Sequence, residues 1–154
     1  MTNNDVLRSI RYLLNFSDPK VLEVAELAGC LATQAEISAF TKREEDDGYE
    51  ECPHEVLACF LDGLIIYKRG EQKDRPRPPL EVPVTNNLVL KKLRVAFSLK
   101  DTDIIDLIKK SSSLDISKAE IGAFFRAPGH PNYRECGDQF LRNFLKAITP
   151  GVSK

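Results

Sequence analysis

The sequence predicts an all-α protein made of two tandem copies of a four-helix unit, joined by a Pro-rich linker. The first observation is a repetition, because TNNDVLRSIR at Thr2 returns as TNNLVLKKLR at Thr85. The second is periodicity, because apolar residues in both halves recur at steps of three and four. Such steps place them along one face of a helix, and no segment shows the period of two that is typical of strands.

The repetition extends over almost the whole chain. At an offset of 83 residues the matched positions are Val6 with Val89, Leu7 with Leu90, Arg11 with Arg94, Asp18 with Asp101, and Leu31 with Leu114. After one inserted residue the offset becomes 84, and AEISAF at 35–40 matches AEIGAF at 119–124. A repeat of this kind indicates a duplicated structural unit. We therefore expect a first helical repeat over 1–70, a linker over 71–84 and a second helical repeat over 85–154.

Each repeat contains four segments with helical periodicity. The first begins at TNN, and we expect one Asn of each pair to cap it, while Asp18 and Asp101 cap the second segments. The third segments open with TQAE at Thr33 and SKAE at Ser117, which is the pattern of a capping box. The fourth segments carry apolar stripes over 56–64 and 140–148.

The linker EQKDRPRPPLEVPV contains four prolines, and each proline lacks an amide donor and restricts the residue before it. We expect an extended, semi-rigid connector that starts after a helix stop at Gly70.

The composition and charge of the chain limit the classes of protein to which it can belong. Of its 154 residues, 42% are hydrophobic and 29% charged, which is typical of a globular protein with a core. The longest apolar stretch, VLACFLDGLIIY, is short and interrupted by Asp62, so no membrane helix is predicted. Four cysteines without a CxxC motif, and an N-terminus without the features of a signal peptide, predict a reduced cytoplasmic protein.

The net charge of −1 conceals a difference between the repeats. Residues 1–70 carry 7 basic and 13 acidic side chains, whereas residues 85–154 carry 12 basic and 7 acidic ones. The two repeats therefore have net charges of −6 and +5. Such asymmetry is typical of a polyanion-binding surface, and it is equally expected of two halves that attract each other.

Two cysteines are the candidates for catalysis. Cys52 and Cys136 each precede the last helical segment of a repeat, where a helix N-terminus can lower the pKa of a thiol. Neither has a paired base or resolving cysteine nearby in the sequence, so we interpret both as structural and predict that the chain is not an enzyme. A thiol-dependent enzyme acting through either cysteine is the minority alternative.

No metal or cofactor is predicted. Cys52, His54, His130 and Cys136 are the residues from which a metal site could be imagined. Their spacings, C-x-H and H-x5-C, match no standard zinc pattern.

The duplicated polar residues can be interpreted in two ways. In the structural interpretation, which we favour, Arg11 pairs with Glu51 and Arg94 pairs with Glu135, so that each pair ties a first helix to a loop. In the functional interpretation, polar and basic residues form a binding surface. Its candidate residues are Asn3, Asn4, Arg11, Asn86, Asn87, Lys91, Lys92, Arg94, Arg126 and Arg134.

Nucleic-acid binding is the sharpest functional alternative, because the second repeat holds enough Lys and Arg for phosphate contacts. Its second and third segments, joined by SSSLDI, can be interpreted as a helix-turn-helix. That turn lacks a well-placed glycine, and KAEIGAFFRA has few side chains suited to base edges.

Several phrases resemble a known family. EECPHEVLACFLDGLIIYKRG, NNLVLKKLRVAFSLKDTDI and NYRECGDQFLRNFLKAI are similar to the YehS-like family of small bacterial proteins, over almost the full length. The resemblance implies a bacterial, cytoplasmic protein with two tandem α-helical domains, and it supplies no activity, cofactor or catalytic residue.

The main functional hypothesis is a non-enzymatic helical binding module whose macromolecular partner is a protein. The alternative is a nucleic-acid-binding regulator that uses the basic second repeat.

Overall fold

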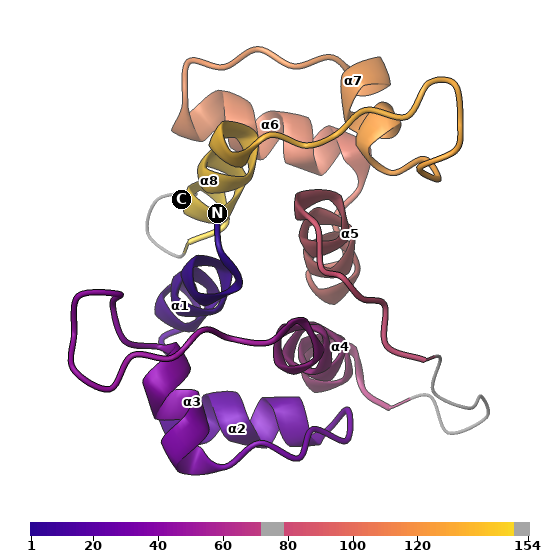
Figure 1. The fold of residues 1–154 in the computed structure, drawn as a ribbon. Helices are drawn as coiled ribbons and strands as arrows, with labels where there is room; N and C mark the ends of the chain where they lie inside the picture. The colour runs from indigo at the N-terminus through magenta and orange to yellow at the C-terminus, as the bar shows by residue number, and fades with distance from the viewer. Residues whose placement is uncertain (72–78, 150–154) are drawn as a thin grey trace. The chain divides into compact units, whose positions relative to one another are not determined.

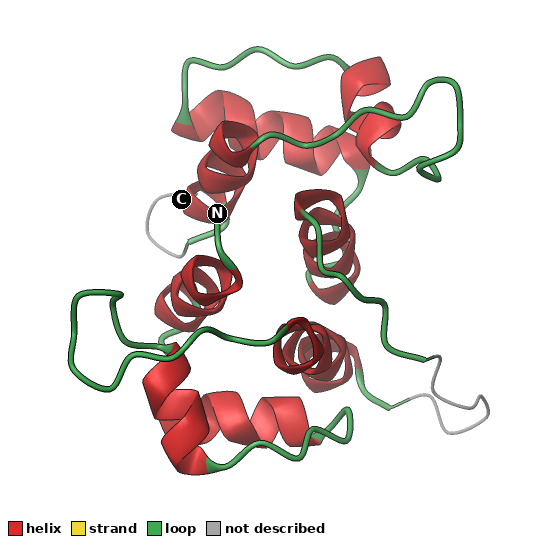
Figure 2. Cartoon of the chain, in the orientation of Figure 1, coloured by secondary structure: helices red, strands yellow, loops and turns green. Residues whose placement is uncertain are grey.

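The computed structural model describes residues 1–71 and 79–149, and within these ranges the chain forms eight helices and no strand (Figures 1 and 2). The chain divides into two compact units, unit 1 (Met1–Val84) and unit 2 (Thr85–Lys154). The predicted fold class, all-α with two tandem four-helix units, is confirmed. Residues 72–78 of the predicted linker lie outside the described residues.

Unit 1 contains α1 (Asn3–Leu13), α2 (Asp18–Glu26), α3 (Gln34–Phe40) and α4 (His54–Arg69). Helix α2 packs against α3 and α4, and α1 packs against α3 and α4. The apolar stripes predicted from the sequence face this core, and its fully buried side chains include Leu7, Ile10, Ile37, Leu57 and Phe60. Helix α4 ends before Gly70, whose φ of 86° suits glycine, as the sequence predicts.

Unit 2 repeats the same order with α5 (Asn86–Ala96), α6 (Asp101–Ser111), α7 (Lys118–Phe124) and α8 (Asp138–Ala147). Helix α6 packs against α7 and α8, and α5 packs against α8. In Figure 1, α6 runs across α8 much as α2 runs across α4 in unit 1. The two repeats therefore build the same four-helix arrangement.

The crossing of α2 and α4 depends on Gly63. A Cβ atom at this position would overlap the backbone carbonyl of Val24 on α2. Only glycine permits this approach of the two backbones. At the matching position, α8 carries the buried Ala147.

Four side chains cap the first and third helices of the two repeats. Thr33 with Glu36 and Ser117 with Glu120 form the two predicted capping boxes, each with reciprocal bonds of 2.9–3.2 Å. The prediction that an Asn caps the first helix is wrong, because Thr2 and Thr85 cap α1 and α5 instead.

The predicted caps of the second helices are wrong by one residue. Ser17 caps α2, and Lys100 precedes α6, so Asp18 and Asp101 occupy the first helical positions. Both aspartates are available for a different role, described below.

Candidate functional site

The second asparagine of the first TNN connects three parts of unit 1. Asn4 is 3% exposed, and its Nδ2 donates to the carbonyl oxygens of Phe40 (3.0 Å) and Glu50 (2.7 Å). Its Oδ1 accepts from the amide of Cys52 (3.0 Å). One amide side chain thus holds α1, the end of α3 and the segment before α4 together, and it satisfies backbone groups that burial would otherwise leave unpaired.

Asn87 does the same in unit 2. It donates to the carbonyl oxygens of Phe124 (3.0 Å) and Arg134 (2.8 Å), and it accepts from the amide of Cys136 (2.8 Å). The first asparagines, Asn3 and Asn86, donate to the carbonyl oxygens of Cys52 and Cys136 at 3.1 and 3.0 Å. All four candidate asparagines therefore bind the protein's own backbone.

The predicted Arg–Glu pairs are wrong. Arg11 Nε donates to Asp18 Oδ1 at 2.8 Å, and that oxygen also accepts from the hydroxyl of Thr41 at 3.1 Å. Glu51 and Glu135 are exposed. The N1 positions of α2 and α6 bring the two aspartates beside the ends of α1 and α5, closer to the arginines than the glutamates on the loops.

In unit 2 the corresponding pair is Arg94 with Asp101. Arg94 Nη2 lies 3.1 Å from Asp101 Oδ1, yet this oxygen has no partner in hydrogen-bonding geometry, so the contact is an ion pair alone. Phe125 replaces the hydroxyl of Thr41, and the Arg94 guanidinium lies 4.4 Å from the centre of its ring. Arg11 and Arg94 are thus engaged within their own units.

The two candidate thiols are buried. Cys52 and Cys136 are each 5% exposed. Burial raises the pKa of Cys52 from 9.0 to about 12, and burial, with the Asp138 carboxylate, raises the pKa of Cys136 from 9.0 to about 12. Each Sγ lies near the carbonyl of the next residue, at 3.5 and 3.6 Å. Both thiols are therefore protonated at neutral pH, the opposite of an activated nucleophile.

The basic candidates of unit 2 are less uniform. Lys91 and Arg126 are exposed, and Lys92 is half-buried. Arg134 forms an ion pair with Glu120 at 3.1 Å. The pKa of the Glu120 carboxylate lies below its usual range. Hydrogen bonds from the backbone and hydroxyl of Ser117 lower it most, and Arg134 lowers it further.

The structure offers little support for a recognition helix in unit 2. Helix α7 has only 7 residues, of which Ile121 and Phe124 are buried. Residues 112–117 separate it from α6, a longer connection than the three or four residues that join the helices of a helix-turn-helix.

Two matched loops are the main surface feature that the sequence-based analysis missed. The acidic loop (residues 42–51) precedes α4, and the basic loop (residues 126–135) precedes α8. Their backbone bonds correspond one to one. In the acidic loop these are Asp46 N–Arg43 O (3.0 Å), Tyr49 N–Asp46 O (3.3 Å) and Glu50 N–Ala39 O (3.3 Å); in the basic loop they are His130 N–Ala127 O (2.9 Å), Tyr133 N–His130 O (3.0 Å) and Arg134 N–Ala123 O (3.2 Å).

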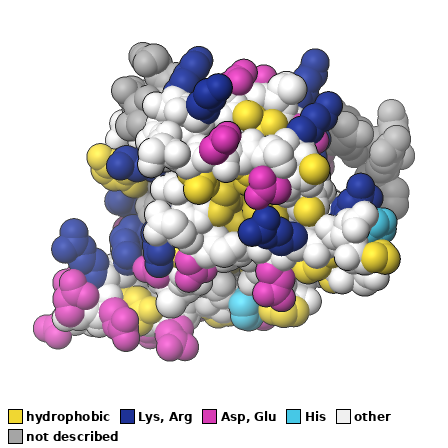
Figure 3. Space-filling view, turned by 90° about the horizontal axis from the view of Figure 1, so that it is seen from above, with side chains coloured by type: hydrophobic (Ala, Val, Ile, Leu, Met, Phe, Trp, Pro, Cys, Tyr) yellow, Lys and Arg dark blue, Asp and Glu magenta, His cyan; other side chains and the backbone are white. Residues whose placement is uncertain are grey.

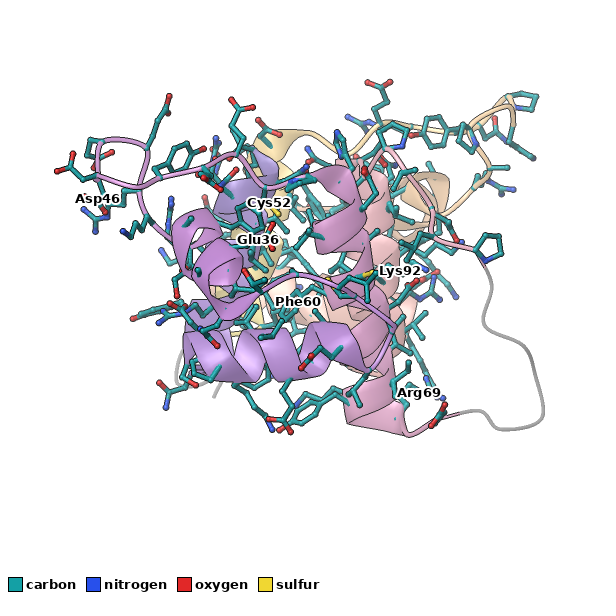
Figure 4. The ribbon with its side chains drawn as sticks, turned by 60° about the horizontal axis from the view of Figure 1, so that its bottom comes forward. Glu36, Asp46, Cys52, Phe60, Arg69 and Lys92 are labelled. Carbon is teal, nitrogen blue, oxygen red and sulfur yellow. The ribbon has the colours of Figure 1, made fainter. Side chains whose placement is uncertain are left out.

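The two loops have the same length but opposite charge. Residues 42–51 read KREEDDGYEE, with two basic and six acidic side chains, whereas 126–135 read RAPGHPNYRE, with two arginines and one glutamate. Figure 4 shows Asp46 at the outer end of its loop, pointing away from the helices, with Cys52 and Phe60 further inside. Aligning the two repeats residue by residue would have exposed this difference in charge.

The described ranges 1–71 and 79–149 contain neither a metal-binding cluster nor a membrane-spanning helix. No three His, Cys, Asp or Glu side chains in them are grouped to hold a metal ion. No helix there has the length and apolar character to cross a membrane.

Comparisons with known proteins agree with the repeat. A family model described as "Protein of unknown function (DUF1456)" matches residues 3–70 and again residues 86–150. The chain is 43% identical over 148 residues to the "Uncharacterized protein YehS" of Escherichia coli (strain K12), covering 96% of this chain and 94% of that relative. No solved structure matches. On both grounds, the repeated family match and the nearly full-length relative, the chain belongs to the DUF1456 family.

Proposed function

We propose that this chain is a non-enzymatic helical module that binds a protein partner. The observation that carries the proposal is the pair of matched loops with one backbone arrangement and opposite charge. Loops held on a rigid scaffold are the usual place for binding residues. The duplicated asparagines and the Arg–Asp pairs stabilise the fold, so they are not free to bind a partner. The matched loops differ in charge, with six acidic side chains in residues 42–51 and one in residues 126–135.

Exposed apolar side chains support a protein partner. Leu31 is 96% exposed and its counterpart Leu114 is 39% exposed. Tyr12 and its counterpart Val95 are 77% and 37% exposed. Apolar and aromatic groups of this kind provide the anchors of protein interfaces, whereas phosphate backbones are bound mainly by basic side chains.

A nucleic-acid regulator is the second candidate, favoured by the exposed basic residues of unit 2. They include Lys91, Lys109, Lys110, Lys118 and Arg126. On the face drawn in Figure 3, however, Lys and Arg side chains are mixed with Asp and Glu side chains around hydrophobic atoms. A mixed surface of this kind favours a protein partner over a polyanion.

Affinity capture from a bacterial lysate, with and without nuclease, distinguishes the two candidates. We expect the intact chain to capture a defined protein in both samples. Direct titration with fluorescent DNA and RNA should show negligible binding at physiological salt. Low-micromolar binding that weakens steeply as salt increases would contradict the proposal and favour the nucleic-acid regulator, because such weakening reports the release of counterions from phosphates.

A further inference from the structure

The basic loop brings two hydrogen-bond donors together without an acceptor. The amide of Asn132 donates to Nδ1 of His130 at 3.0 Å. A neutral imidazole that accepts at Nδ1 carries its proton on Nε2. Nη1 of Arg126 lies 3.3 Å from this Nε2, and a guanidinium only donates.

No protonation state of His130 removes this conflict. If the proton moves to Nδ1, Nε2 accepts from Arg126, but the N–H of Nδ1 then faces the amide of Asn132. In the imidazolium form both nitrogens face donors. Two hydrogen bonds hold the backbone of His130 in place beside these donors. The His130 amide donates to the Ala127 carbonyl at 2.9 Å, and the Tyr133 amide donates to the His130 carbonyl at 3.0 Å. An acceptor shared by Arg126 and His130 Nε2 resolves the conflict.

The acidic loop of unit 1 supplies acceptors at the matching places. Asp46 stands where unit 2 has His130, and Lys42 stands where it has Arg126. Asp46 accepts from the amide of Arg43 at 3.2 Å, and Lys42 donates to the carbonyl oxygen of Asp47 at 2.9 Å. In the basic loop no carboxylate stands at either place, and Arg126 Nη1 and His130 Nε2 lie 3.3 Å apart.

We propose that Arg126 and His130 form a binding site for an oxyanion, a carboxylate or phosphate group of another molecule. Both side chains are exposed, so such a group can approach from solvent. An oxyanion accepts from the guanidinium and from Nε2–H together, and charge assistance strengthens both bonds. Assigning this group to a partner protein rests on the proposed function, whereas the site itself does not.

Imidazole NMR of the full-length ¹⁵N-labelled chain tests the site directly. The chain has 2 histidines, so His54 serves as an internal reference. Without anion, we expect the neutral ring of His130 to carry its proton on Nε2, because Nδ1 accepts from the Asn132 amide. Inorganic phosphate, and acetate in a separate titration, should shift only His130 in a saturable way, with a Kd of about 1–10 mM for the tighter anion. Tighter binding of phosphate assigns the site to phosphate groups, and tighter binding of acetate assigns it to carboxylates.

Three variants make the test specific. Arg126→Ala should weaken binding at least about tenfold, since it removes the charge-assisted donor. His130→Asp should abolish binding, because a carboxylate at this position can itself accept from Arg126 and repels an anion. Lys146→Ala, at an exposed position of α8, is the matched control and should bind like wild type.

The proposal is overturned by an Nδ1–H tautomer or by shifts that chloride reproduces at equal ionic strength. Anion binding that survives Arg126→Ala would also overturn it. This titration needs no partner, so its failure and a failed protein capture are independent results.

Discussion

At the scale of single residues, the second asparagine of each TNN, Asn4 or Asn87, forms hydrogen bonds with three distant backbone groups. Replacing Asn4 by Ala leaves one amide and two carbonyl groups without their partner, and Asn4 is 3% exposed. Unsatisfied buried groups cost about 1–3 kcal/mol each before relaxation. We expect Asn4→Ala to lower the free energy of unfolding by roughly 2–4 kcal/mol in urea denaturation.

Asn87→Ala is the matched comparison. Asn87 is half-buried and one of its partners, Arg134, is exposed, so water can replace part of what is lost. Its effect should be smaller, about 1–2 kcal/mol. Equal losses at the two positions would show that burial does not set the cost of this bond network.

The thiols provide a second residue-scale prediction. Raising the thiol pKa from 9.0 to about 12 lowers the thiolate fraction at pH 8 by about 10³. Iodoacetamide should therefore modify Cys52 and Cys136 far more slowly in the native chain than in urea, as measured by peptide mass spectrometry. Rapid native labelling at either position would contradict a structural role and restore the thiol-enzyme alternative.

The same shift predicts how stability depends on pH. The folded state keeps these protons more tightly than the unfolded state, so this contribution to stability is complete below pH 9. It is lost as the pH rises from about 9 towards about 12. Urea denaturation across this range should show a steeper loss for wild type than for a Cys52→Ala, Cys136→Ala double variant.

At the scale of elements, a single glycine controls how closely α2 and α4 pack. A Cβ at Gly63 overlaps a backbone carbonyl, which cannot move as a side chain can. Gly63→Ala should therefore destabilise the chain by about 2–3 kcal/mol through overpacking.

Gly122→Ala on α7 is the control for this change. Nothing lies within 4 Å of a Cβ at Gly122, so alanine adds only its helix propensity there. Thermal unfolding should show a gain of about 0.5–1 kcal/mol. If Gly63→Ala were equally harmless, α2 and α4 would not pack as closely as described.

The sequence predicted the elements far better than the polar contacts between them. Helical periodicity and the boxes at Thr33 and Ser117 depend on neighbours within one or two turns, so they can be recognised locally. The partners of Asn4 lie 36–48 residues away, and no local pattern points to them. The sequence therefore indicates caps or ligands where the asparagines bond distant backbone groups, and it pairs Arg11 and Arg94 with the wrong acidic residues.

At the scale of the whole molecule, the two repeats share one scaffold, and their matched loops differ in charge. The two four-helix units share helix order, asparagine bonds and loop backbone, while net charge differs between the repeats. The internal repeat revealed the scaffold from the sequence. The proposal that the loops bind a partner depends on their matched backbone hydrogen bonds. These bonds are visible only in the structure.

The most direct test of the central claim is to exchange residues 42–51 with residues 126–135 within one chain. Both segments have ten residues and the same backbone bonds, so the exchanged chain should fold with an unchanged helix content and net charge. Capture by the exchanged chain is then compared with capture by wild type. We expect the wild-type partner to be lost or bound at least about tenfold more weakly, since complementary charges govern recognition. Unchanged capture by a correctly folded exchanged chain would contradict the account.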